Sequence, residues 1–354
     1  MAKDNNPTII YPEGSYGGEV LDHLLLRTAH SNETYQNNLI HVETDVTYKL
    51  TLPMADIGNV IQDNVPTPKL TDGEVNGDLN KITITERTLE PKDFMVFLKW
   101  YPEHMASYWK PFKPTGNLIF RELDPAVQAD FISLILQKKD QYIGDAIWIG
   151  VEGGAEKSGI ETPDGAVALG SGDCKYFDGV IKRALDSQDE AHEMNRVNIT
   201  GSSLLDTGEA VEKALYATFR SVEPRLRPSL RNMTFVMSHN TFLEYDEYLT
   251  SQTYKYRDNT TIQERTFKGV RIVPVAGVPD HTIVLGKFSR DITSNLWMAI
   301  DWATRKDEDA VKIGDISNYS AEKFFQMRLK MDVNIVKPCE IYMHTAYKKA
   351  GAEG

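Results

Sequence analysis

The stretch SAEKFFQMRLKMDVNIVKPCEIYMHTA (320–346) contains the clearest secondary-structure signal in the chain. From Phe325 to Ile335 every second residue is apolar, and polar residues stand between them. This two-residue period predicts a half-buried β-strand, and at about 3.3 Å per residue the strand is about 36 Å long.

A long amphipathic helix of matching length is predicted upstream, at 124–148. Asp124 is a favoured N-cap and Pro125 fits the first turn, and apolar residues then recur at three- and four-residue spacings as far as Trp148. At 1.5 Å per residue the helix is about 35 Å long. A long helix beside a long strand predicts a flat, elongated unit instead of a globule.

Two strands flank a long segment that has no core of its own. Apolar residues alternate from Val46 to Leu52, and again at Ile82 and Ile84, whereas residues 53–81 hold three prolines and three glycines. We interpret 46–90 as two strands that carry a hairpin-like excursion. A loop of about 30 residues is unusual inside a compact domain. The segment is either a mobile loop or an arm that folds onto a neighbouring subunit.

The remaining elements are predicted from shorter patterns. A short helix is expected around 20–26. The aromatic-rich stretch 91–120 is expected to pack in the core with short helices, although it would also suit an interface. Asp206 and Glu209 form a capping pattern for one later helix, and Asn240 is the expected cap of another. The further expected elements are helices at 177–185, 206–222 and 240–249, strands at 40–42, 234–237, 270–275, 282–286 and 296–300, and loops at 150–172 and 250–266.

Length, charge and cysteine content exclude several classes of protein. The 354 residues correspond to roughly two domains at about 150 residues each. With 39 basic and 51 acidic residues the formal charge is −12, which argues against a protein that wraps nucleic acid. Two cysteines cannot form a disulfide framework, so we expect folding in a reducing compartment. No apolar run approaches the roughly 20 residues of a membrane span, and no secretory signal is recognised.

No motif predicts catalysis, a cofactor or a metal site. Ser238 and His239 follow a predicted strand, but neighbours on a strand point to opposite faces and no nucleophile elbow surrounds them. Glu156 stands where a phosphate-binding loop needs glycine before Lys157. The acidic residues 307–309 lack the spacing of a known cation loop, and the histidines are too scattered for zinc.

Three passages, taken in order, resemble the major capsid proteins of tailed bacteriophages, whose HK97-like fold also occurs in encapsulin shells. The resemblance rests on the order and spacing of elements and covers about residues 46 to 345. The passages are LDPAVQADFISLILQKKDQYIGDAIWIG (123–150), similar to the family's spine helix; RNMTFVMSHNTFLEYDEYL (231–249) with KGVRIVPVAGVPDHTIVLGKFS (268–289), similar to its axial domain; and 320–346, similar to its long peripheral strand and closing strand.

The resemblance implies an α+β, HK97-like fold whose domains are assigned by position. The implied parts are an N-terminal arm (1–45), an extended loop or E-loop (46–92), a peripheral domain with the spine helix and long strand (93–160 and 316–346), an axial domain (161–315) and a C-terminal tail (347–354). Relatives with a fused scaffold segment carry a longer region before the extended loop. Only residues 1–45 precede it here, which suggests a separate scaffolding protein or none.

The function implied by the resemblance is structural, not enzymatic. Copies are expected to self-assemble as pentamers and hexamers into an icosahedral shell that encloses double-stranded DNA without sequence-specific binding. Expected partners are other copies, a portal protein, a scaffolding protein and, as a further option, decoration proteins, with no membrane and no cofactor. The subunit would be made in the bacterial host cytoplasm and end in the virion. An encapsulin-like compartment and, less favoured, a soluble α/β enzyme remain as alternatives.

The extended loop supplies the candidate contacts between subunits. Its apolar residues are expected to anchor on a neighbour, together with two lysines that lie in the same loop. Some family members crosslink a loop lysine to an asparagine of a neighbour, but no partner is identified in this sequence, so no crosslink is predicted. The candidate contact residues are Ile57, Val60, Ile61, Pro66, Lys69, Leu70 and Lys81.

Overall fold

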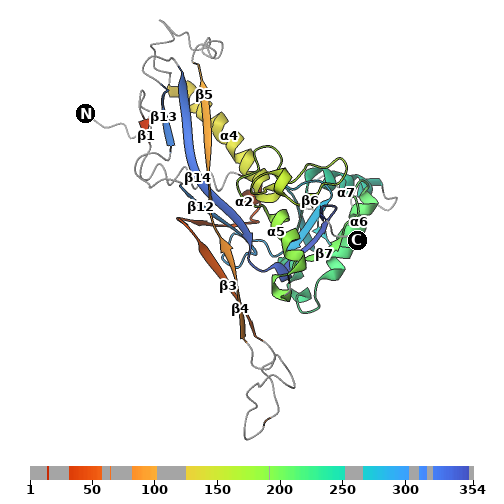
Figure 1. Cartoon of the computed structure of the whole chain (residues 1–354). Helices are drawn as coiled ribbons and strands as arrows, with labels where there is room; N and C mark the ends of the chain where they lie inside the picture. The colour runs from red at the N-terminus through yellow and green to blue at the C-terminus, as the bar shows by residue number, and fades with distance from the viewer. Residues whose placement is uncertain are drawn as a thin grey trace, which may run out of the picture.

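The computed structural model describes residues 14–15, 32–57, 64, 82–101, 125–190, 192–251, 266–302, 311–316 and 322–350. In this part the chain is elongated and α+β, with two six-stranded sheets (Figure 1). The described α-helices are α2 (Glu33–Gln36), α4 (Pro125–Ile149), α5 (Val180–Asp186), α6 (Gly208–Ser221) and α7 (His239–Ser251). Short 3-10 helices are η4 (Ala155–Lys157), η5 (Ser187–Asp189), η6 (Glu193–Asn195), η7 (Arg227–Asn232) and η8 (Pro338–Glu340).

The first sheet, which we call the β14 sheet, is built on one long strand. Its strands are β1 (Gly14–Ser15), β2 (His41–Thr44), β5 (Lys92–Trp100), β12 (Leu296–Trp302), β13 (Val311–Asp315) and β14 (Lys323–Ile335). On one side β14 pairs with β5. On the other side it pairs first with β13 and then with β12. The long strand predicted at 325–335 is confirmed and begins two residues earlier, at Lys323.

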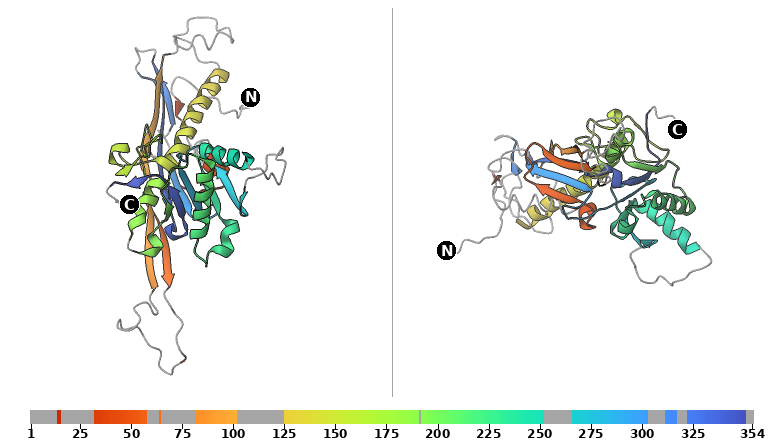
Figure 2. Two further views of the ribbon diagram at one scale, coloured as in Figure 1. Left: turned by 90° about the vertical axis from the view of Figure 1, so that its right-hand side faces the viewer. Right: turned by 90° about the horizontal axis from the view of Figure 1, so that it is seen from below.

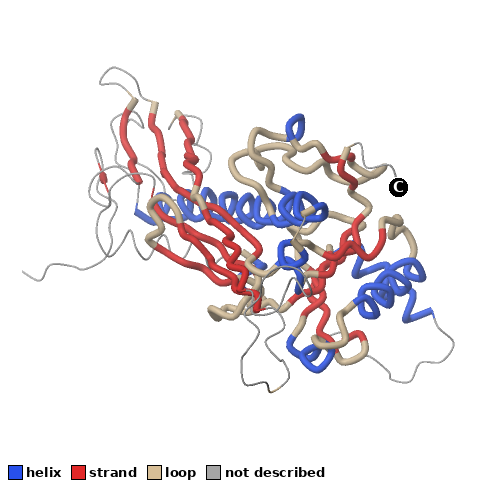
Figure 3. The backbone as a smooth tube through the Cα atoms, turned by 60° about the horizontal axis from the view of Figure 1, so that its bottom comes forward, coloured by secondary structure: helices blue, strands red, loops and turns tan. Residues whose placement is uncertain are grey.

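Helix α4 lies along one face of the β14 sheet (Figure 3). The alternation of β14 aims its apolar side chains at this helix: Met327, Leu329 and Met331 are fully buried in one cluster with Ile143 and Ile147 of α4. The helix predicted at 124–148 is confirmed at Pro125–Ile149. A helix and a strand of matched length therefore form the flat unit that the two periodicities predicted.

The second sheet, the β8 sheet, is covered on both faces. Its strands, in spatial order, are β7 (Asn198–Gly201), β15 (Tyr342–Thr345), β11 (Thr282–Gly286), β8 (Thr234–Met237), β10 (Val270–Pro274) and β9 (Thr266–Phe267). Val236 and Val284 face the cluster shared with α4 and β14, whereas Phe235 and Leu285 face a second cluster with α6. Because both faces of the central strands β8 and β11 are buried, these two strands are mainly apolar runs. Figure 2 shows the two sheets as two lobes.

The hairpin of β3 (Leu50–Ile57) and β4 (Ile82–Leu89) projects away from both lobes (Figures 1 and 2). The two strands are antiparallel, with Leu50 opposite Leu89 and Ile57 opposite Ile82. The hairpin predicted over 46–90 is thereby confirmed. A further two-stranded sheet joins β6 (Ile160–Glu161) to β16 (Lys348–Lys349).

The aromatic stretch at 91–120 was expected to form short helices, and this expectation is wrong for its first part. Residues 92–100 form β5, because Phe94 and Val96 alternate with exposed residues and the strand pairs with β14 along its whole length. Residues 102–124 lie outside the described part of the chain, as does the short helix expected around 20–26.

The expected helix caps are displaced by one or two residues. Thr207 Oγ1, and not Asp206, accepts from the amide of Ala210 at the start of α6, at 3.3 Å. Ser238 Oγ accepts from the amide of Thr241 at the start of α7, at 3.1 Å. Asn240, the predicted cap, instead donates to Asp280. Adjacent small polar residues compete for one cap, and the backbone entry angle selects among them.

Candidate assembly surfaces

Strand β5 lies at an edge of the β14 sheet and exposes apolar side chains. It pairs with β14 on one side, and no described strand pairs with its other side. Met95, Phe97 and Leu98 are 47%, 48% and 39% exposed. Edge strands of soluble proteins are usually protected by charges or proline. Here residues 94–98 are all apolar, so this surface, which we call the β5 edge (residues 92–100), is a candidate contact with another chain.

A groove of about 360 Å³ runs between the β5 edge and α4. Its floor is aromatic: the ring of Phe94 lies 5.9 Å from that of Tyr142 and 5.8 Å from that of Tyr176. Burial raises the pKa of Tyr142, so its phenol stays neutral. The other residues that line the groove are Met95, Val96, Phe97, Leu98, Ile135, Lys138, Lys139 and Asp173. The groove is therefore mainly apolar, with two lysines on the side that α4 forms.

The base of the hairpin is packed on the outer face of the β14 sheet. Leu52 and Leu89 from the hairpin form a small buried cluster with Trp297 and Ala299 of β12. These residues point away from α4, so the outer face is covered at its β12 end. Met95 and Phe97 lie on the same outer face at the other end and remain exposed.

Arg87 of β4 fixes the hairpin to the segment after α5. Its guanidinium donates to Ser187 Oγ at 3.0 Å and to the carbonyl of Asn195 at 2.9 Å. Burial is the main reason that the pKa of Arg87 is lowered, and nearby Glu190 opposes this effect. A cation on the hairpin stem is thereby held against the body of the molecule.

Two buried polar residues of β14 hold the next part of the hairpin. The carboxylate of Asp332 accepts from the amide of Glu90 at 2.8 Å and from the Arg183 guanidinium at 2.6 Å. Asn334 donates to the carbonyl of Thr88 at 2.7 Å. Beyond the end of β5, side chains therefore replace strand pairing along this side of β14, and the hairpin leaves the body in a fixed direction.

The described part of the hairpin carries exposed apolar residues, with Ile84 65% and nearby Tyr48 82% exposed. Of the candidate contacts, Ile57 ends β3 and its backbone faces Ile82. The other six lie outside the described residues: Val60, Ile61, Pro66, Lys69, Leu70 and Lys81. The assembly role of all seven stays a prediction.

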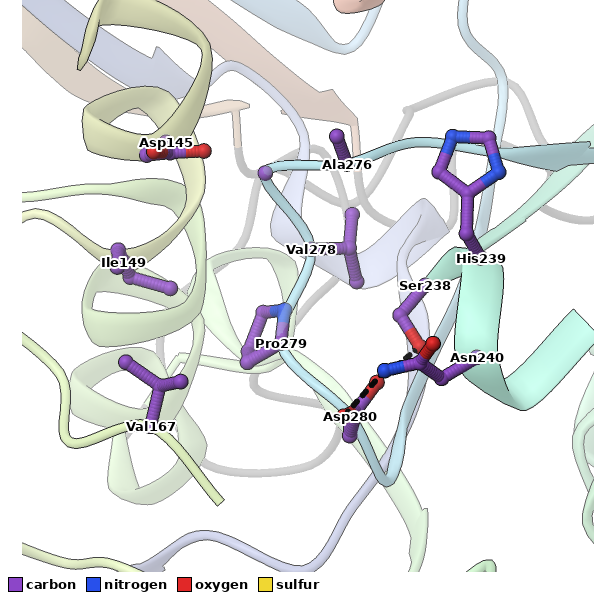
Figure 4. A pocket seen from close by; sticks show the side chains of 11 residues that line it. Asp145, Ile149, Val167, Ser238, His239, Asn240, Ala276, Val278, Pro279 and Asp280 are labelled. Carbon is purple, nitrogen blue, oxygen red and sulfur yellow. Dashed lines mark hydrogen bonds between the residues drawn. The ribbon is translucent and has the colours of Figure 1, made fainter. Parts of the chain in front are cut away.

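A cleft of about 400 Å³ lies where α4 meets α7 and the turn 275–280 (Figure 4). Ser238 and Asn240 both donate to the Asp280 carboxylate, whereas His239 contacts Glu33 of α2 at 3.2 Å. The neighbours Ser238 and His239 thus have different partners and form no nucleophile–base pair. They have the helix-entry role that the sequence favoured.

The described residues provide neither a metal site nor a membrane-spanning helix. No group of three or more His, Cys, Asp or Glu side chains is arranged there to hold a metal ion. Among the described helices, none combines the length and the apolar character that crossing a membrane requires.

Comparison with known proteins identifies the fold. No protein-family model matches the chain, and no curated protein matches it. Among solved structures, the satellite phage P4 procapsid that includes the size determination (Sid) protein matches with a TM-score of 0.57 and 11% identity, over 94% of this chain and 92% of that one. The capsid of the native GTA particle matches with a TM-score of 0.51 and 12% identity, over 97% and 94%.

The chain has the HK97-like capsid fold. The capsid of the empty GTA particle is also similar, with a TM-score of 0.50 and 11% identity over 88% of this chain and 95% of that one. The resemblance stated from the sequence is therefore confirmed at the level of the fold.

Sequence reasoning left open an interface in the aromatic stretch 91–120 of this HK97-like chain, but it did not identify the β5 edge. The signal was present, since residues 94–98 are five apolar residues flanked by charged ones. Such a run fits a buried strand as well as an edge strand, and only the pairing with β14 distinguishes them. The polar anchors Arg87, Asp332 and Asn334 carry no local motif, because their partners are distant in sequence.

Proposed function

We propose that this chain is a structural capsid protein that self-assembles as pentamers and hexamers into an icosahedral shell around double-stranded phage DNA. The observation that carries the proposal is the surface that a single copy leaves uncovered. The β5 edge and the projecting hairpin both expose apolar side chains. The shared fold with the phage P4 procapsid and the GTA capsid supports the same conclusion. The role is structural and not enzymatic.

The domain boundaries follow the same proposal. The parts are an arm (1–45), an extended loop (46–92), a peripheral domain (93–160 and 316–346), an axial domain (161–315) and a tail (347–354). The β14 sheet with α4 supports a peripheral unit, and the β8 sheet with α6 and α7 supports an axial one. Strands β12 and β15 pair across these boundaries, with β14 and β11, which holds the two units together.

Assembly would proceed through many shared contacts. The extended loop lies on an adjacent subunit, where Ile57, Val60, Ile61 and Leu70 supply apolar anchors and Pro66, Lys69 and Lys81 lie beside them. Each contact is weak by itself, and the closed shell is stable because many contacts act together. The wider partners are a portal protein and a scaffolding protein, with decoration proteins as a further option. The subunit is made in the host cytoplasm and ends in the virion.

Removing the hairpin tip tests this function. Residues 58–81 are replaced by Asn-Gly, which closes a two-residue hairpin between β3 and β4. We expect a folded, soluble subunit that no longer closes shells, while the wild-type chain forms shells visible by negative-stain electron microscopy. Lys213→Ala, which removes only an exposed pair with Glu209 on α6, serves as the control and assembles normally.

Three results would contradict the proposal at different points. Normal shells from the shortened chain would show that the loop has no assembly role. A wild-type chain that stays monomeric in light scattering at high concentration would oppose a shell protein altogether. Purified shells that contain protein cargo in place of nucleic acid would identify an encapsulin-like compartment.

A further inference from the structure

The β5 edge has the composition of a strand that pairs with another strand on its second side when the protein is assembled. Its nine residues have charges only toward the ends, at Lys92, Asp93 and Lys99, and none at 94–98. An exposed, uncharged apolar edge without proline pairs with any available strand, so proteins that leave it open aggregate. No described strand of this chain occupies that side of β5, so the edge is suited to a strand of another chain.

The sequence of β5 is complementary to itself in one antiparallel register. When Val96 is placed opposite Val96 of a second copy, Met95 faces Phe97 and Phe94 faces Leu98. In the same register Asp93 faces Lys99 at both ends of the pair. A shift by two residues in either direction would place Asp93 or Lys99 opposite an apolar side chain. Opposite charges and apolar pairs across strands both stabilise a sheet.

We propose that β5 pairs antiparallel with β5 of a second copy about a two-fold axis at Val96, so that the β14 sheet continues across two subunits. This contact deepens the proposed shell function, on which it rests for its biological setting. Side chains directly opposite each other lie on the same face. A two-fold axis perpendicular to the sheet therefore keeps both α4 helices on one side.

The pairing covers the apolar surface on both faces of the sheet. On the outer face, the half-exposed Met95 and Phe97 of each copy cover one another. On the inner face, the half-exposed Leu98 meets the Phe94 side of the partner's groove, whose floor is aromatic. Each strand also gains partners for the backbone groups of residues 94–98 that face away from β14.

The terminal charges remain available for this contact. Asp93 lies 3.6 Å from Lys330, and Lys99 lies 3.2 Å from Glu322 within the chain. Both side chains are still more than half exposed, at 67% and 62%. Each can therefore reach a further opposite charge on a second copy, and the register is fixed by two such pairs.

A single cysteine at the symmetry axis tests the contact. In V96C the two cysteines face each other, with Cα atoms about 4.5 or 5.5 Å apart, and both separations suit a disulfide. We expect most of the V96C chain to run as a disulfide-linked dimer on a non-reducing gel after mild oxidation. The wild-type chain, with Cys174 buried and Cys339 half-buried, should stay monomeric on the same gel.

A cysteine on the same strand provides the matched control. In this register two copies of Lys92 are eight residues apart along the strands, or about 27 Å. K92C should therefore give no dimer under the same oxidation. The double variant M95C/F97C changes only exposed positions, so it should keep the fold even if V96C disturbs it. Its disulfide should join position 95 of one copy to position 97 of the other.

The possible outcomes test the β5–β5 pairing separately from the proposed shell function. Absence of dimer in both V96C and M95C/F97C overturns the two-fold pairing, even if shells form. Equal linking of K92C and V96C also overturns it, because it would show non-specific contact or another occupant, such as the hairpin of a neighbour. Specific linking of V96C without shells would keep the pairing and reject the proposed function.

Discussion

Replacing Asp332 with alanine removes one of the polar groups that join the hairpin base to the body. The Asp332 side chain is 1% exposed and accepts from the Arg183 guanidinium and from the amides of Glu90 and Val333. Without it, the cation of Arg183, whose side chain is only 24% exposed, loses its carboxylate partner and keeps only the neutral carbonyl of Asp178 as an acceptor. Breaking a buried ion pair in this way costs about 3–5 kcal/mol. We expect D332A to lose that much free energy of unfolding.

Urea unfolding of the unassembled subunit, followed by the fluorescence of the buried Trp148 and Trp297, measures this loss. The matched control is Asp93→Ala, which removes a carboxylate from the same sheet. Asp93 is 67% exposed and 3.6 Å from Lys330, and such surface pairs contribute about 0–1 kcal/mol. Proteolysis near Glu90 should also be faster in D332A than in D93A. Equal free energies of unfolding for the two variants would refute the reasoning.

Two further predictions concern packing and pH. A methyl group at Gly277 would lie 2.2 Å from the carbonyl oxygen of Gly144, so Gly277→Ala should lower the free energy of unfolding in urea by about 1–3 kcal/mol. Gly144→Ala, where the nearest atom is 3.7 Å away, should leave that free energy unchanged or raise it. Equal effects of the two substitutions would contradict the close contact at Gly277. Burial lowers the pKa of His344 below 6.5, so the unfolded chain binds the proton more tightly and the free energy of unfolding should fall as the pH drops below about 6.5. His344→Gln should reduce that slope, and an unchanged slope would rule out His344 as its source.

The sequence predicted the elements whose signal is local and repeated. The alternation of 325–335 and the three- and four-residue spacing of 124–148 each report burial on one face, and this information is complete within the segment. The β3–β4 hairpin was predicted in the same way. Element boundaries shifted by a residue or two, as at Lys323, because the pattern fades where side chains become polar.

Elements that depend on distant partners were harder to predict. Strand β5 was mistaken for short helices because its aromatic residues and the following prolines give no clear period. Its pairing of Phe94 with Leu329 joins positions far apart in the chain. The hydrogen bond from Arg87 to the carbonyl of Asn195 likewise joins residues that are far apart in the chain. The predicted contacts at the hairpin tip depend on other copies, so neither a single sequence nor a single chain contains their partners.

The two-sided pairing of β14 has a mechanical consequence. Strand β5 binds one of its sides, β13 and β12 bind the other, and Asp332 and Asn334 extend the attachment past the end of β5. A pull along the strand would strain all these bonds together in shear, and none could be peeled open singly. In the proposed shell, tension within a subunit would therefore be carried along β14, and the contacts between subunits would yield first.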